Sequence, residues 1–190
     1  MRNPSTSKLV QVMASDAFYR RWIVWLPLLI TSVIVFGGYS KDVMGIQWVA
    51  GLAAIARANI SSINVWARKS SFPEATQLIF LLAWLFSFYY AFLVARWKPY
   101  REMYVGSLTG RRRHLKALPG LMMICIGLFF LNVTVLEAPS CRRMCIYKSE
   151  FIQVFYSNGV SFLLGYGFAL IYWYLANFSK IYRCGGEKNE

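Results

Sequence analysis

Long apolar runs without an ionisable side chain alternate with short polar segments along this chain. Four runs lack Asp, Glu, Lys, Arg and His altogether: Trp22–Tyr39, Leu78–Ala95, Leu118–Leu136 and Val154–Leu175. Each run holds 18 to 22 residues, and a helix of that length crosses a hydrocarbon core of about 30 Å. The pattern therefore predicts an all-α fold, a polytopic membrane protein with a bundle of four transmembrane helices in a single domain, 1–190.

The segments between the runs predict how this bundle is oriented. With four crossings, the tails 1–21 and 176–190 share one side of the membrane with the loop 96–117. These three segments carry 14 Lys and Arg residues, whereas the loops 40–77 and 137–153 carry 7. Because cytoplasmic segments of membrane proteins are enriched in Lys and Arg, we expect both termini to be cytoplasmic. A multi-pass protein of the plasma or inner membrane is the localisation that follows.

The positive net charge of the chain predicts an anionic partner for the bundle. The chain has a formal charge of +13 and 57% apolar residues, and basic residues that flank membrane helices bind anionic lipid headgroups. We expect contacts with anionic lipid or with a partner protein from the basic loop residues Arg111, Arg112, Arg113 and Lys116. No nucleic-acid-binding module is visible, so the charge does not indicate a nucleic-acid partner.

The segment Met44–Arg68 is apolar but carries Arg57 near its middle. On a helix, its small and polar residues form one face, and its large apolar residues, among them Trp48 and Trp66, lie mostly on the other. This pattern favours an amphipathic helix in the first outer loop that lies at the membrane interface. The alternative is a fifth span, which places an arginine in the bilayer at a cost of about 2.5–3.5 kcal/mol and moves the C-terminus to the other side.

Two ladders with a four-residue spacing predict how the spans pack. The last run carries small residues at Ser157, Ser161, Gly165 and Ala169, and the second run carries aromatic residues at Phe80, Trp84, Phe88 and Phe92. Small residues let two membrane helices approach closely, so we expect the aromatic ridge to lie in the small-residue groove. The alternative is that the aromatic residues face lipid and the groove meets another span or another protein.

Polar residues inside the runs are few. Asn132 and Asn158 are the notable ones, and an asparagine in lipid forms a hydrogen bond to a neighbouring helix. Their expected role is structural, with the lining of a substrate path as the alternative. Pro27 removes one backbone N–H from the first run, which permits a kink there.

Candidate chemistry is sparse. The chain has one histidine, His114, and eight scattered carboxylates, so we expect no catalytic site, metal site or cofactor. Cys141 and Cys145 lie in the second outer loop and are candidates for a disulfide. The layout is similar to that of quinone-linked disulfide-forming membrane oxidases, which implies thiol–disulfide chemistry at this pair, but those enzymes carry cysteine pairs in both outer loops and this first outer loop has none.

These features favour a non-enzymatic protein that acts through helix–helix and protein–protein contacts. The expected role is an accessory or scaffold subunit of a membrane complex, with another membrane protein or a second copy of the chain as partner. One alternative is a membrane immunity protein that neutralises a membrane-active toxin. Another is a small channel, carrier or lipid-handling protein with Asn132 and Asn158 as polar lining.

Overall fold

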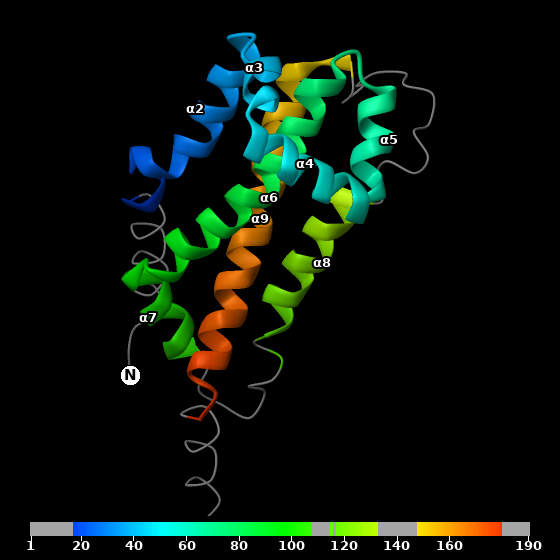
Figure 1. Ribbon diagram of the computed structural model, residues 1–190. Helices are drawn as coiled ribbons and strands as arrows, with labels where there is room; N and C mark the ends of the chain where they lie inside the picture. The colour runs from blue at the N-terminus through cyan, green and yellow to red at the C-terminus, as the bar shows by residue number, and fades with distance from the viewer. Residues whose placement is uncertain (1–16, 108–114, 116, 133–147, 180–190) are drawn as a thin grey trace, which may run out of the picture.

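The computed structural model describes residues 17–107, 115, 117–132 and 148–179 (Figure 1). The described residues form helices and contain no strand, which confirms the all-α class. The helices are α2 (Trp22–Phe36), α3 (Ser40–Gly45), α4 (Gln47–Asn59), α5 (Ser61–Lys69), α6 (Pro73–Ala95), α7 (Lys98–Ser107), α8 (Leu118–Asn132) and α9 (Glu150–Ala176).

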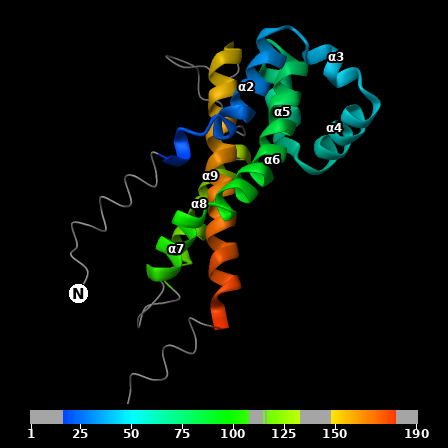
Figure 2. The same cartoon turned by 90° about the vertical axis from the view of Figure 1, so that its left-hand side faces the viewer.

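Helix α9 is the central element of the fold. It packs against α6 on one side and α8 on another, and α2 contacts both α6 and α9. Both views show α6 and α9 running in the same direction, from the end that holds α3 to the end that holds α7 (Figures 1 and 2). Figure 1 shows α2 and α8 running the opposite way. The four longest apolar helices therefore alternate in direction along the chain.

Two of these helices are long and apolar enough to cross a membrane. They are α6 with 23 residues and α9 with 27. The first and third predicted spans are represented by α2 and α8, which have 15 residues each, or about 22 Å of helix. Helix α2 ends at Phe36, because Gly37 and Gly38 follow and Gly38 takes a positive φ of 78°. Crossing of the membrane by all four helices stays a prediction.

The two long helices begin earlier than the apolar runs indicated. Helix α6 starts at Pro73, whose missing N–H is harmless in a first turn. Helix α9 starts at Glu150, and the Ser149 hydroxyl caps it by accepting a hydrogen bond from the Ile152 amide at 3.4 Å. Polar residues of the preceding loops therefore belong to these helices.

The expectation of one continuous helix over 44–68 is wrong. This segment is divided among α3, α4 and α5, and the chain turns at Ile60, whose φ and ψ of −122° and 89° are not helical. Helix α5 packs against α6, and both views show α4 and α5 as a folded-back pair beside the bundle (Figures 1 and 2). The segment is thus neither a single interfacial helix nor a single fifth span.

Candidate functional site

The small residues of α9 lie against α6. Ser157, Ser161 and Ala169 are buried, and a Cβ atom added to Gly165 would lie 2.5 Å from Tyr90 Cβ and 2.7 Å from the Ser87 carbonyl oxygen. The Ser161 hydroxyl approaches the Ala83 carbonyl of α6 at 2.9 Å. The glycine and serine therefore bring the two backbones into contact, as the small-residue ladder predicts for a close helix pair.

The aromatic ladder of α6 does not enter this groove, which corrects the expected arrangement. The α6 residues that face Gly165 are Ser87, Tyr90 and Ala91. Phe88 and Phe92 are exposed on the flank of the helix pair, where Phe88 stacks on Phe168 of α9 at 6.2 Å. Large rings between the helices would hold the backbones apart, so the close approach at Gly165 requires the small face of α6 instead.

The other half of the aromatic ladder packs elsewhere. Phe80 is buried against Trp66 of α5, with ring centroids 5.0 Å apart, and Trp84 borders the same cluster of side chains. This cluster joins α5 to α6 and α9. The four aromatic residues thus divide between an inner contact with the folded-back pair and an outer flank.

A second close helix contact joins α8 to α9 and depends on glycines that sequence reasoning did not single out. A Cβ atom added to Gly167 would lie 2.9 Å from the Gly120 carbonyl oxygen, and one added to Gly127 would lie 2.6 Å from Leu164 Cγ. Gly120 and Gly127 are seven residues apart on one face of α8. The seven-residue spacing of these glycines could have predicted the contact with α9, because it places small residues on one side of an apolar helix.

Tyrosine hydroxyls meet the backbone of α2 next to Pro27. Proline lacks an N–H, so the carbonyl of Ile23, four residues earlier, has no helical donor. Tyr89 of α6 donates a hydrogen bond to this carbonyl at 2.7 Å, and Tyr90 donates one to the Val24 carbonyl at 3.0 Å. Pro27 therefore marks the place where α6 is hydrogen-bonded to α2.

A polar cluster joins the starts of α6 and α9. The Thr76 hydroxyl donates to Gln153 Oε1 at 2.9 Å, and Gln153 Nε2 donates to the Ser70 hydroxyl at 3.3 Å. Thr76 and Gln153 are buried, so these hydrogen bonds satisfy groups that would otherwise be costly to remove from water. Gln153 adjoins the charge-free run, and sequence reasoning did not assign it a role.

The two asparagines that the sequence places inside apolar runs are positioned differently from each other. Asn158 is buried on α9, and its Nδ2 donates to the Val154 carbonyl of the same helix at 2.9 Å. Asn132 ends α8, and its side chain lies outside the described part of the structure. Near this end the interhelical bond comes from Tyr156, whose hydroxyl donates to the Phe130 carbonyl at 2.8 Å.

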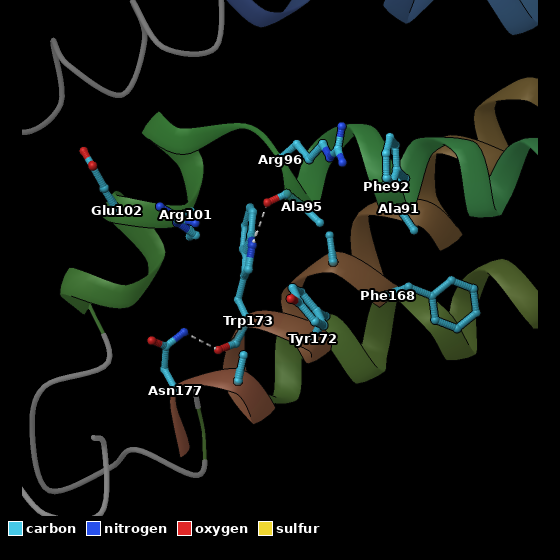
Figure 3. A pocket seen from close by; sticks show the side chains of 12 residues that line it. Ala91, Phe92, Ala95, Arg96, Arg101, Glu102, Phe168, Tyr172, Trp173 and Asn177 are labelled. Atoms are coloured by element: carbon cyan, nitrogen blue, oxygen red, sulfur yellow. Dashed lines mark hydrogen bonds between the residues drawn. The ribbon is translucent and has the colours of Figure 1, made fainter. Parts of the chain in front are cut away.

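A groove opens where α6 ends, between α6, α7 and the last turns of α9 (Figure 3). Its volume is about 1080 Å³. Phe92, Phe168 and Tyr172 line one part of it together with several alanines, and Arg101, Glu102 and Asn177 line the other. Arg96, which also lines the groove, lies beside Phe92. The floor of the groove is fixed by Trp173, whose indole Nε1 donates to the Ala95 carbonyl at 3.1 Å.

The remaining predicted site residues lie outside the described residues. They are the loop residues Arg111, Arg112, Arg113 and Lys116 and the cysteines Cys141 and Cys145. Cys125, on α8, is an exposed free thiol. Among the described residues, no three His, Cys, Asp or Glu side chains gather as metal ligands do. No protein-family model, curated protein or solved structure matches the chain.

Proposed function

We propose that the chain is an integral membrane protein with four crossings that acts as an accessory or scaffold subunit through contacts of its helices. The observation that carries this proposal is the outer surface of the bundle. Large apolar side chains are exposed on α2, α4, α6, α8 and α9, for example Trp25, Leu52, Phe88, Phe129 and Tyr172. Soluble monomers rarely expose large apolar patches, and lipid or a partner protein would cover these side chains.

Helix α2 supports the scaffold role most directly. One of its faces packs on the bundle through Val24, Pro27, Thr31 and Val35. The opposite face carries a continuous apolar stripe that is exposed from one end of the helix to the other: Trp22, Trp25, Leu29, Val33 and Phe36. A second helix fits such a stripe by side-chain packing. We therefore assign the partner contact, with another membrane protein or a second copy, to this face of α2.

Membrane embedding is tested by extraction and by topology. Alkaline carbonate should leave the full-length chain in the membrane fraction, and reporter tags should place both termini in the cytoplasm. Release by carbonate contradicts the proposal altogether. Tags in opposite compartments contradict the four-crossing topology, because the number of crossings must then be odd.

The scaffold role is tested by photo-crosslinking in intact membranes. A photoreactive amino acid replaces Leu29 on the exposed stripe, and the same amino acid replaces Val24 on the buried face as the matched control. We expect a discrete protein adduct at position 29, either with a partner of fixed mass or with a second copy of the chain. The control should give only links within the chain. Lipid adducts alone at position 29 contradict a scaffold role for this face.

The groove beside α7 favours a lipid-handling protein as the second candidate function. It combines an apolar part and a cationic part in one continuous space, which are the two kinds of surface that a phospholipid presents. Movement of labelled phospholipid between leaflets of reconstituted vesicles tests this candidate. Vesicles with the protein should then equalise the label faster than empty vesicles, and equal rates contradict it.

A further inference from the structure

The groove between α6, α7 and α9 changes from apolar to cationic along its length. Figure 3 shows Phe92, Ala91 and Phe168 at one end, and Arg101 and Asn177 at the other, with Trp173 between them. Arg96 lies beside Phe92, with its guanidinium carbon 4.1 Å from the ring centroid. This contact holds a charge at the border between the two parts of the groove.

The charged residues of the groove are more cationic than anionic. Among the described residues, Lys98 and Glu102 form an ion pair at 3.7 Å, and no carboxylate pairs with Arg96 or Arg101. In Figure 3 the Glu102 side chain points away from Trp173. The charged residues that line the groove are two cations, Arg96 and Arg101, and one anion, Glu102, so the lining has a net positive charge and attracts an anionic group.

We propose that this groove binds one anionic phospholipid of the adjoining membrane leaflet. Arg96 and Arg101 bind its phosphate, and an acyl chain lies along Phe92, Phe168 and the alanines between them. Guanidinium groups suit this role because they form bidentate hydrogen bonds with phosphate oxygens. The proposal rests on the membrane embedding proposed above, since that embedding puts the end of α6 at headgroup depth.

The test uses the full-length protein, purified in a neutral detergent and freed of lipid. Native mass spectrometry then counts bound lipid during titration with phosphatidylglycerol or with phosphatidylcholine. We expect one phosphatidylglycerol molecule to bind before any other, and phosphatidylcholine to bind more weakly. The double variant R96Q/R101Q should bind phosphatidylglycerol about 25-fold more weakly, since each basic residue near an anionic surface contributes roughly a fivefold factor.

Two matched variants separate a site from a general effect of charge or bulk. R68Q/K69Q removes the same charge from the exposed end of α5 and should leave lipid affinity unchanged. Ala176→Trp fills the groove without altering charge and should weaken phosphatidylglycerol binding, whereas Ala58→Trp on the exposed side of α4 should not. Equal losses in R96Q/R101Q and R68Q/K69Q overturn the proposal, as does full binding by Ala176→Trp.

A soluble headgroup distinguishes a lipid from a free phosphate compound. Glycerophosphoglycerol carries the same phosphodiester without acyl chains and should displace phosphatidylglycerol only at far higher concentration. Displacement at equal concentration overturns the lipid as occupant. The outcome is separable from that of the membrane proposal: release by carbonate contradicts embedding, whereas a carbonate-resistant chain with equal affinity for both lipids contradicts this inference alone.

Discussion

Several aromatic side chains of this bundle donate hydrogen bonds to backbone carbonyls of a neighbouring helix. In an apolar environment an unpaired carbonyl costs several kcal/mol, so each one needs a donor. Tyr89 supplies the donor for the Ile23 carbonyl that Pro27 leaves without one, and Trp173 supplies one for the Ala95 carbonyl at the end of α6. These aromatic residues serve as hydrogen-bond donors between helices as well as apolar bulk.

The pairing of Tyr89 with Pro27 predicts an energetic coupling. Tyr89→Phe should lower the free energy of unfolding by about 1 kcal/mol, because the Ile23 carbonyl loses its donor. In a Pro27→Ala background the restored N–H replaces that donor, so Tyr89→Phe should then cost little. Reversible unfolding in mixed micelles measures this double-mutant cycle. Tyr90→Phe is the control, because its hydroxyl donates to the Val24 carbonyl, which does not lose its helical donor through Pro27. Equal coupling of Pro27→Ala with Tyr89→Phe and with Tyr90→Phe would contradict the role given to Tyr89.

Replacement of glycine by leucine should change the stability of the fold in opposite directions at two positions of α9. Gly165→Leu forces a side chain into the Ser87 and Tyr90 backbone region and should destabilise the fold by about 3 kcal/mol. Gly159 has open space around its Cβ position, and Gly159→Leu should raise stability by less than about 1 kcal/mol through helix propensity. Thermal unfolding in detergent compares the two, and equal melting temperatures argue against the close α6–α9 contact.

Residue spacing in the sequence indicated some of these contacts and not others. The small-residue ladder that includes Gly165 was visible because small residues at four-residue spacing share a helix face. The face of α6 that packs against this ladder could not be predicted, because both the aromatic and the small residues of α6 repeat with helical spacing. Only packing in three dimensions selects between the two faces. The bonds from Tyr89 and Tyr90 join residues 66 positions apart, and no local pattern encodes a contact of that separation.

At the scale of elements, the folded-back pair α4–α5 is held by packing against α6 and by side-chain hydrogen bonds near the turn between α4 and α5. The Asn59 side chain donates to the Ile55 carbonyl at 2.8 Å, and Asn64 donates to the Arg57 carbonyl at 3.2 Å. Arg57 lies in the last turn of α4, where carbonyls lack a helical donor, so the bond from Asn64 satisfies one of them. No local signal indicated a turn at Ile60, because neither glycine nor proline stands there, and the apolar pattern alone fitted one continuous helix.

Two tryptophans distinguish the inner and outer faces of this pair. Trp66 is 1% exposed and packs on Phe80, whereas Trp48 is 65% exposed. Trp66→Ala should cost about 3–5 kcal/mol and release α5 from α6, so protease cleavage near Lys69 should become faster. Trp48→Ala should change stability by no more than about 0.5 kcal/mol in detergent. Equal cleavage rates in the two variants would mean that α5 is not anchored through Trp66.

For the whole molecule, the described residues place polar side chains inside the bundle and large apolar side chains on its surface as well as in its core. The buried interior contains hydrogen-bonded polar residues such as Thr76, Gln153 and Ser161, while large apolar side chains occupy the outer faces of several helices. In water, packing of apolar groups inward drives folding. In lipid that force between helices is absent, and small residues, close packing and interhelical hydrogen bonds take its place. The contacts of α9 with α6 and α8 include small residues at Gly165 and Gly167, and Ser161 lies within hydrogen-bond distance of the Ala83 carbonyl.

This difference predicts how the protein responds to a surface charge. Leu29 is 59% exposed near the middle of α2. If α2 crosses a membrane, Leu29→Arg places a charge in the hydrocarbon core and should cost about 2.5–3.5 kcal/mol of insertion. Trp22→Arg, at the exposed start of the same helix, should cost far less, because an arginine there reaches the headgroups. The fraction of chain that resists alkaline carbonate measures both variants, with expression level as a control. In a water-soluble bundle both substitutions would fall on the solvated surface and change little, so equal retention of the two variants would contradict a membrane crossing by α2.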